Sequence, residues 1–164
     1  MTFHIRIRPT ALILEQNSVL LIEYQSEQRG TYYFVPGGGA EPGETIKETV
    51  RRELLEEAAV EADVGQVAFL FECEPQQRAD GYSPSSHTLF VVFECERTPD
   101  SIPRMPEHPE LYQTDVKWMP LSRLKTIKIM PEMTDAILEY ARKRNGADFV
   151  EDHKTIENTV ERGD

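Results

Sequence analysis

The sequence contains few basic residues, few cysteines and no long hydrophobic segment. No uninterrupted apolar run approaches the ~20 residues that a membrane-spanning helix needs, so we expect no membrane association. Residues 1–8 are interrupted by His4, Arg6 and Arg8, and they lack the apolar core of a signal peptide. We therefore expect a cytoplasmic protein.

Only two cysteines are present, Cys73 and Cys95, and each lies in a segment that reads as a strand. Two cysteines in a cytoplasmic chain are typically reduced core residues, so we expect no disulfide. No Cys-x-x-Cys pair and no Cys/His spacing indicates a zinc site.

Basic side chains are outnumbered, with 18 Lys and Arg against 29 Asp and Glu and a net charge of −11. An acidic protein repels a polyanion unless it has a local basic patch, and the basic residues here are scattered. We therefore expect no nucleic acid polymer as partner. A cluster of carboxylates instead indicates a cation, and a cation can carry a phosphate substrate.

The 164 residues suit one domain with one sizeable core. Alternating apolar residues and helical periodicity predict an α/β domain (α+β type) over residues 1–145, with a mixed β-sheet sandwiched between helices. The polar segment 146–164 is expected to be a loosely attached or disordered tail. We predict a hairpin from the first two strands and an irregular, proline-rich loop at 97–113. The predicted strands are 3–14, 19–24, 32–35, 67–73, 88–95 and 115–119, and the predicted helices are 45–58 and 132–143.

The first helix has the clearest signals. Thr45 is a candidate N-cap, and Glu48 three residues later would complete a capping box. Apolar residues at four-residue steps form a stripe along it, namely Ile46, Val50, Leu54 and Ala58. In the second helix, Pro131 suits the first turn, and the expected core face is Met133, Ile137 and Tyr140.

A glycine-rich loop precedes the first helix, and three glutamates lie within about a third of its circumference. The glycines allow close approach of the backbone to a ligand. Clustered carboxylates repel one another unless a divalent cation such as magnesium, manganese or calcium binds between them. A solvated acidic face is the alternative, but the loop and the neighbouring Arg52 favour a metal site. The three acids are Glu53, Glu56 and Glu57.

Residues 38–60 resemble the Nudix box, Gly-x5-Glu-x7-Arg-Glu-U-x-Glu-Glu-x-Gly-U, in which U is a bulky aliphatic residue. Eight of the nine fixed positions match, and weaker similarity extends over about residues 10–143. The departure is Ala59, where the family has a glycine that ends the helix in a left-handed residue. Alanine costs roughly 1 kcal/mol if that conformation is kept, and it removes no ligand. The matching residues are Gly38, Glu44, Arg52, Glu53, Leu54, Glu56, Glu57 and Val60.

The resemblance implies the roles of these residues. Metal binding, by Mg²⁺ with Mn²⁺ as a substitute, falls to the three clustered glutamates with a backbone carbonyl near Gly37 or Gly38. Arg52 would orient the glutamates and Glu44 would support the loop. The implied activity is metal-dependent hydrolysis of the diphosphate linkage in a small nucleoside diphosphate derivative, such as a nucleotide sugar, ADP-ribose, a dinucleotide or an NTP.

The general base is left open by the box. Glu57 or Glu53 is the preferred choice, and four later acids are alternatives that each also read as surface carboxylates. Substrate contacts are proposed for one residue of the aromatic strand and for three basic residues, although each also has an ordinary structural reading. The later acids are Glu94, Glu96, Glu107 and Glu110. The substrate contacts are Tyr33, Arg6, Arg8 and His87.

Two features bear weakly on substrate choice. Pro75, fifteen residues past Val60, resembles the proline of ADP-ribose pyrophosphatases. Diadenosine polyphosphate hydrolases tend to have a tyrosine in the corresponding region, whereas position 78 here is Arg and the nearest tyrosine is Tyr82. A catalytically silent Nudix-fold nucleotide-binding regulator is the alternative function, but such proteins usually lose box acids. A structural calcium site has no Asp-x-Asp-x-Asp-Gly loop to support it. A homodimer is left open.

Overall fold

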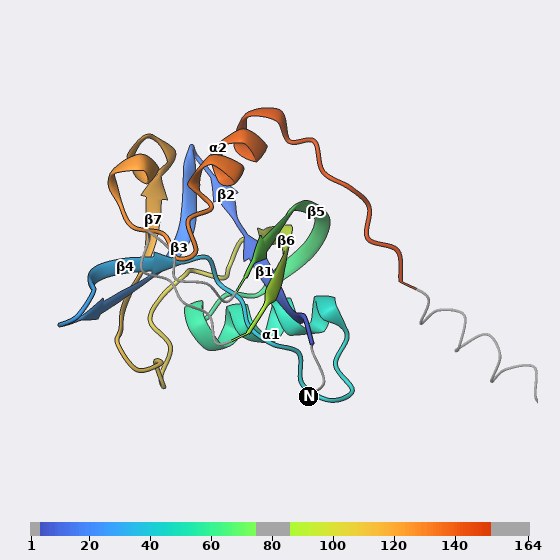
Figure 1. Cartoon of the computed structure of the whole chain (residues 1–164), viewed down its shortest axis with the longest axis horizontal. Coiled ribbons are helices and arrows are strands. Elements are labelled where there is room, and N and C mark those ends of the chain that lie inside the picture. The colour runs from blue at the N-terminus through green and yellow to red at the C-terminus, as the bar shows by residue number, and fades with distance from the viewer. Residues whose placement is uncertain (1–3, 75–85, 152–164) are drawn as a thin grey trace, which may run out of the picture.

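The computed structural model describes residues 4–74 and 86–151, and its strands form two sheets (Figure 1). In the first sheet the middle strand pairs in parallel on one side and antiparallel on the other, so the sheet is mixed. Its order is β1 (Arg6–Leu12), β6 (Thr88–Arg97) and β5 (Ala62–Cys73).

The second sheet is antiparallel, with one long strand at its centre. That strand pairs with three others, which come from both the early and the late part of the chain. The members are β2 (Leu14–Glu15), β3 (Ser18–Ser26), β4 (Gly30–Phe34) and β7 (Gln113–Pro120).

The hairpin expected from the first two strands is smaller than predicted. Only Leu14 and Glu15 pair with β3, while β1 leaves that sheet and pairs in parallel with β6. Gln16 and Asn17 both have positive φ, 48° and 58°, which is the geometry of a tight two-residue hairpin turn. The predicted pairing was wrong because the end of β1 is buried on both faces, and this burial depends on tertiary contacts with β6.

Two helices cover opposite faces of the strands (Figure 1). α1 (Ile46–Ala58) packs its apolar stripe into one hydrophobic cluster, and α2 (Thr134–Lys143) packs Ile137 and Tyr140 into the other. A short 3-10 helix, η1 (Leu121–Thr126), leads from β7 toward α2. This arrangement confirms the expected α/β domain with helices on either side of the strands, although the strands form two sheets, of which the first is mixed.

The ends of two elements differ from the sequence-based prediction. β5 starts at Ala62, five residues early, because a bulge between Val64 and Val67 breaks the alternation that identifies a strand. α2 starts at Thr134, so Pro131 precedes the helix and does not lie in its first turn.

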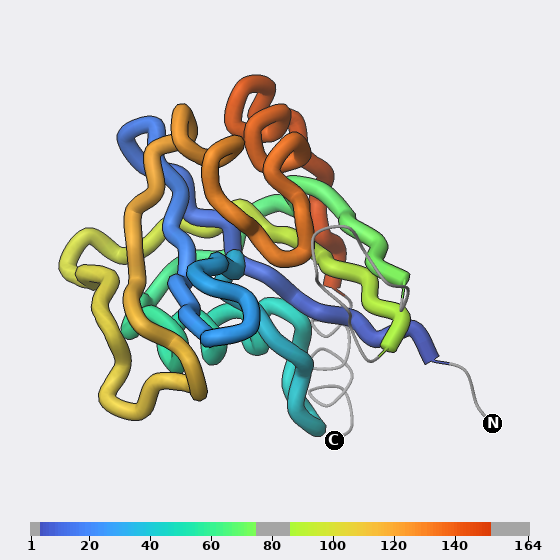
Figure 2. The backbone as a smooth tube through the Cα atoms, turned by 60° about the vertical axis from the view of Figure 1, so that its left-hand side comes forward, coloured from blue at the N-terminus to red at the C-terminus, as the bar shows by residue number. Residues whose placement is uncertain are grey.

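The segment after α2 contacts the first sheet. Ala147 bridges to Val67 of β5, and the ring of Phe149 meets that of Phe93 edge-on at 5.1 Å between centroids. Figure 2 shows this segment descending beside β5 and β6. Packing therefore continues past residue 145, and residues 152–164 of the expected tail lie outside the described residues.

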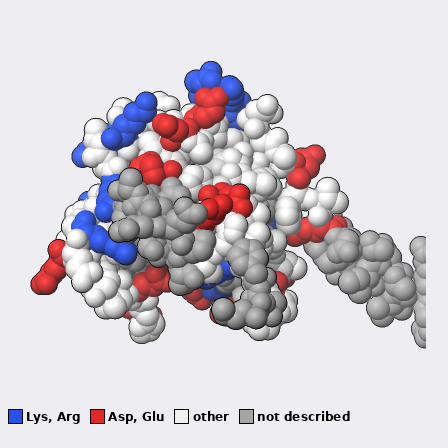
Figure 3. Space-filling view, viewed as in Figure 1, with Lys and Arg blue, Asp and Glu red and all other residues white. Residues whose placement is uncertain are grey.

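Two further expectations can be compared with the structure. Cys73 and Cys95 are both free and buried, which confirms them as core thiols. Among residues 4–74 and 86–151, no helix is both long and apolar enough to cross a membrane. On the face drawn in Figure 3, basic side chains gather at the top near the end of α2 and along the left side, with acidic ones between them.

Candidate functional site

The glycine loop is held against the edge of β1. The Gly38 amide donates to the Pro9 carbonyl at 3.2 Å, and Gly37 bridges to Thr10. A β-carbon at Gly38 would collide with the carboxylate of Glu53. Glycine at this position therefore lets the loop lie directly over the acidic face of α1.

Arg52 connects that loop to the helix. Its Nε donates to Glu44 at 2.7 Å, and its Nη1 donates to Glu53 and Glu56 at 3.0 Å each. Nη2 donates to the Gly39 carbonyl at 2.9 Å. The guanidinium thus bonds two of the clustered glutamates and the glycine loop at once.

Glu44 is anchored at the start of the helix. The Thr49 hydroxyl donates to it at 2.6 Å, in addition to the two bonds from Arg52. The bonds from Arg52 and then from Thr49 hold the pKa of the Glu44 carboxyl at about 2. Glu44 is therefore charged and keeps Arg52 in place at any ordinary pH.

Glu53 and Glu57 form a buried acidic pair, with 8% and 3% of their surfaces exposed. The Gly37 amide donates to Glu57 at 3.2 Å. Burial, the hydrogen bond and charge of Glu53, and the charge of Glu110 raise the pKa of Glu57 well above its ordinary value, against the opposing influence of Arg8. Arg52 compensates the charge of Glu53, whereas Glu57 is a buried acid beside a second acid.

The side-chain and backbone oxygens at this site are of the kind that binds a divalent cation, but the side chains are not already arranged around one point. Carboxylate and carbonyl oxygens are the ligands that Mg²⁺ and Mn²⁺ prefer. Among the residues that the structure describes, no three His, Cys, Asp or Glu side chains form a ready metal cluster. Glu56 lies on Arg52 with its side chain 56% exposed, so Glu53 and Glu57 are the buried donors.

Both N-terminal arginines lie at the glycine loop. Arg8 donates to the Gly37 carbonyl at 2.8 Å, and its guanidinium lies 5.9 Å from the centre of the Phe90 ring. A β-carbon at Gly39 would lie 2.9 Å from an Nη of Arg6. The first strand therefore brings two positive charges to the glycine loop.

Tyr33 and His87 lie elsewhere. Tyr33 is buried in the cluster on the α2 side, and its hydroxyl donates to Glu23 at 2.9 Å. Its neighbour Tyr32 points to the α1 side, since successive residues of a strand alternate. His87 lies 2.7 Å from Glu72.

Of the four later acids, Glu110 is the one that the structure brings to Glu57. The Tyr24 hydroxyl donates to Glu110 at 2.9 Å, and Gln113 donates to the Glu57 carbonyl at 2.8 Å. Sequence reasoning missed Tyr24 and Gln113, because both depend on a loop folding back over the helix. Glu96 and Glu107 are exposed on β6 and on the loop before β7.

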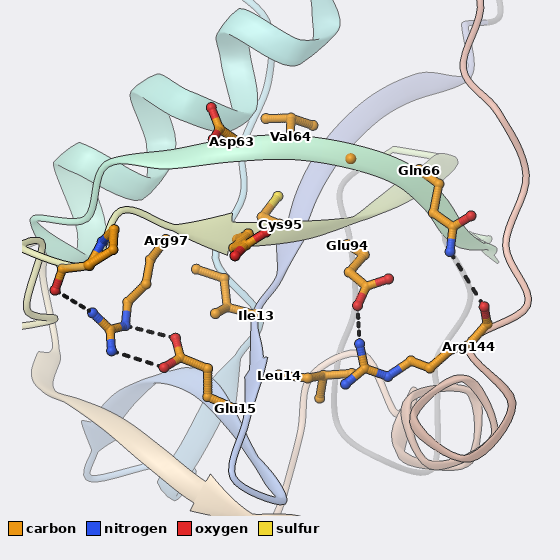
Figure 4. Close-up of a pocket in the computed structure, with 13 residues that line it drawn as sticks. Ile13, Leu14, Glu15, Asp63, Val64, Gln66, Glu94, Cys95, Arg97 and Arg144 are labelled. Carbon is orange, nitrogen blue, oxygen red and sulfur yellow. Dashed lines mark hydrogen bonds and ion pairs between the residues drawn. The ribbon is translucent and has the colours of Figure 1, made fainter.

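Glu94 belongs to a separate hollow of about 750 Å³, which contains no box residue (Figure 4). Glu94 accepts hydrogen bonds from Tyr140 and Arg144. Arg97 forms an ion pair with Glu15 at 2.7 Å across the same hollow. Four of its charged residues thus form two ion pairs, Glu15 with Arg97 and Glu94 with Arg144.

Comparison with known proteins agrees with this geometry. The NUDIX domain family model matches residues 5–140. The nucleoside triphosphatase NudI of Enterobacter sp. (strain 638) is 28% identical over 123 residues, which cover 71% of this chain and 84% of that protein.

Solved structures agree at the level of the fold. A NUDIX hydrolase from Nitrosomonas europaea superposes with a TM-score of 0.70 at 16% identity, covering 89% of this chain and 94% of its own. A MutT NUDIX hydrolase from Burkholderia pseudomallei gives 0.64 at 20% identity, covering 83% and 97%. The chain belongs to the Nudix hydrolase family.

Proposed function

We propose that this Nudix hydrolase cleaves the diphosphate linkage of a nucleoside diphosphate derivative with Mg²⁺, for which Mn²⁺ can substitute. The observation that carries the proposal is the buried pair Glu53 and Glu57, which faces a glycine loop flanked by two arginines. The printed name of the Enterobacter relative, a nucleoside triphosphatase, supports nucleoside triphosphates as first candidates within this class.

Metal binding is assigned to Glu53, Glu57 and Glu56, with a backbone carbonyl at Gly38. A bound cation would neutralise the charge that develops on the diphosphate. Because Arg52 already bonds Glu53 and Glu56, we assign it the role of aiming these carboxylates rather than binding substrate. Glu44, through Arg52 and the loop, is assigned a positioning role.

Phosphate binding is assigned to Arg8 and Arg6. One Nη of Arg8 donates to the Gly37 carbonyl. Because a guanidinium has five N–H donors, other donors are left for a phosphate. The charge of Arg8 also lowers the pKa of Glu57, so the guanidinium lies within electrostatic reach of the acidic pair. Tyr33 and His87 are not carried into this assignment, because Glu23 and Glu72 occupy their polar groups.

The role of general base, which accepts the proton from the attacking water, is assigned to Glu57 or Glu53. Glu110, on the later loop, is the alternative. Glu110 is supported by its electrostatic effect on Glu57 and by the hydroxyl of Tyr24 that fixes one of its oxygens. The silent-regulator alternative has less support, because no box acid is missing.

The test is a product-identified screen of the purified chain. The substrates are NTPs, nucleotide sugars, ADP-ribose, dinucleoside polyphosphates and NADH, each with Mg²⁺, with Mn²⁺ and with excess EDTA. We expect turnover of at least one substrate with either metal and loss of turnover in EDTA, because the proposed reaction needs a cation that neutralises the charge developing on the diphosphate beside the buried acids. Full turnover in EDTA would contradict the metal mechanism, and tight binding without turnover would favour the regulator.

A further inference from the structure

A cleft lies between the β3–β4 turn and the end of the loop that leads into β7. Its volume is about 520 Å³, and it contains none of the residues assigned above. The lining combines two tyrosine rings, a guanidinium and the polar atoms of a turn. The lining residues are Ser26, Glu27, Gln28, Arg29, Tyr32 and Tyr112.

Tyr112 differs from the other lining residues because the residue is 54% exposed and its backbone has φ of 70°. A tyrosine in the left-handed region is strained, and such strain concentrates at functional positions. The Gln25 amide donates to the Tyr112 carbonyl at 3.0 Å and holds this backbone in place. The fold therefore fixes an aromatic face toward solvent at the cleft.

The other wall is formed by Tyr32 and Arg29. Tyr32 is only 5% exposed, and the Arg29 guanidinium lies 5.9 Å from the centre of its ring. The Ser26 hydroxyl accepts from the Arg29 amide at 3.2 Å and closes the turn. A planar guanidinium supported on an aromatic ring can stack on a further planar group.

Contacts between side chains connect the cleft to the acidic site. Tyr32 stacks on Tyr24, with ring centroids 5.6 Å apart and planes at 14°. The Tyr24 hydroxyl in turn donates to Glu110, whose charge acts on Glu57. Glu110 and Tyr112 also lie two positions apart on the loop before β7, so this loop contributes to both the cleft and the surroundings of Glu57.

We propose that this cleft binds the nucleobase of the substrate, with the base stacked on Tyr112 and flanked by Arg29. The proposal rests on the function proposed above. It adds recognition of the base, whereas the residues of the Nudix box are assigned to the metal and the diphosphate. Glu27 in the lining repels a phosphate and accepts from base N–H groups, so the cleft suits the ring rather than the diphosphate.

The first experiment measures steady-state kinetics on the best nucleotide for Tyr112→Ala, Tyr112→Asn, Tyr112→Phe and Arg29→Gln. Asparagine removes the ring yet tolerates a positive φ, so it keeps the test valid if the alanine variant folds poorly. Loss of stacking should raise KM about tenfold for the alanine and asparagine variants, with kcat nearly unchanged. Tyr112→Phe and the matched control Leu111→Ala, which is 78% exposed outside the lining, should behave as wild type.

The second experiment needs no turnover. Unphosphorylated nucleosides are titrated into the wild-type chain, and NMR shifts of the Tyr112 ring and the Arg29 Nε–H group are followed. Shifts at these groups, lost in Tyr112→Asn, support the base site even if no nucleotide is hydrolysed. Unchanged KM in the alanine and asparagine variants, or nucleoside shifts confined to other residues, would overturn the base site while hydrolysis itself still stood.

Discussion

At the scale of single residues, Arg52 and Glu57 occupy opposite electrostatic surroundings. Arg52 is surrounded by acids, and the hydrogen bonds of Glu44 raise its pKa further above its ordinary value. Glu57 is buried against another acid with the Gly37 amide as a neutral donor. The same short segment therefore contains one charge that its neighbours compensate well and one that they compensate poorly.

Neutralising the buried acids should separate activity from stability. We expect Glu57→Gln and Glu53→Gln each to lower kcat by roughly a hundredfold or more, because each removes a charge aimed at the diphosphate and its cation. Glu57→Gln should keep or raise the midpoint of thermal unfolding, since a buried repulsion is relieved. Kinetics at saturating Mg²⁺ and thermal unfolding provide the measurement.

Glu61→Gln is the matched control, because Glu61 is exposed just beyond the same helix. It should match wild type in both measurements. Near wild-type kcat in both Glu53 and Glu57 variants would show that the reaction takes place elsewhere.

Glu23 should contribute to stability in a pH-dependent way. Burial raises the pKa of Glu23, but hydrogen bonds from Lys117, Thr114 and Tyr33 outweigh burial and lower it below 4.5. A lowered pKa stabilises the fold above the unfolded value of about 4.5, and this stabilisation is lost as pH falls through the folded pKa. Glu23→Gln should therefore cost roughly 1–3 kcal/mol at neutral pH and less below pH 4.5.

Urea unfolding of wild type and Glu23→Gln from neutral to acidic pH measures this difference. Glu107→Gln, a change at an exposed acid of the loop, should show a negligible effect at all pH values. A gap between wild type and Glu23→Gln that widens in acid would contradict the assignment.

At the scale of elements, the ends of α1 show how local signals shape the site. Thr45 caps the helix and Glu48 bonds back to it, completing the capping box that the sequence predicts. At the other end Ala59 has φ of 55°, so the left-handed termination is kept although glycine is absent. Glu57 therefore lies in the last turn of a regular helix whose end is conformationally strained.

Ala59→Gly should relieve that strain. We expect the free energy of unfolding to rise by up to about 1 kcal/mol, because glycine adopts positive φ without the Cβ clash. Turnover should stay within a few-fold of wild type, since a methyl group neither binds metal nor moves a proton. Thermal unfolding and kinetics on one preparation measure both, and a hundredfold gain in kcat would indicate that the natural box is impaired.

At the scale of the whole molecule, a segment beyond the second helix completes the domain. Phe149 packs on Phe93 at the centre of the first sheet, and the Lys47 ammonium of α1 lies 5.9 Å from its ring. The residues after α2 are therefore joined to the same core as the helix that carries the glutamates.

Phe149→Ala should lower the free energy of unfolding by roughly 1–3 kcal/mol, the range for removing a partly buried large apolar side chain. Val150→Ala is the matched control, because Val150 is 89% exposed and should change little. Chemical denaturation of the full chain measures both. Equal stability of Phe149→Ala and wild type would show that this segment does not contribute to the core.

Local patterns in the sequence were sufficient to predict the box helix, its cap and the acids on one face, because each is set by residues within four positions of one another. The glycine loop followed from the same short stretch. These predictions required no knowledge of distant contacts, which is why the metal-binding face could be proposed from 23 residues of sequence.

Only the tertiary structure decided what surrounds those acids. The parallel pairing of β1 with β6 brings Arg8 to the Gly37 carbonyl, 29 positions away. The loop before β7 brings Glu110 to Tyr24 over 86 positions and Gln113 to the end of α1 over 56. A periodicity holds no information about which distant segments meet, because that choice depends on burying both faces of the strands at once.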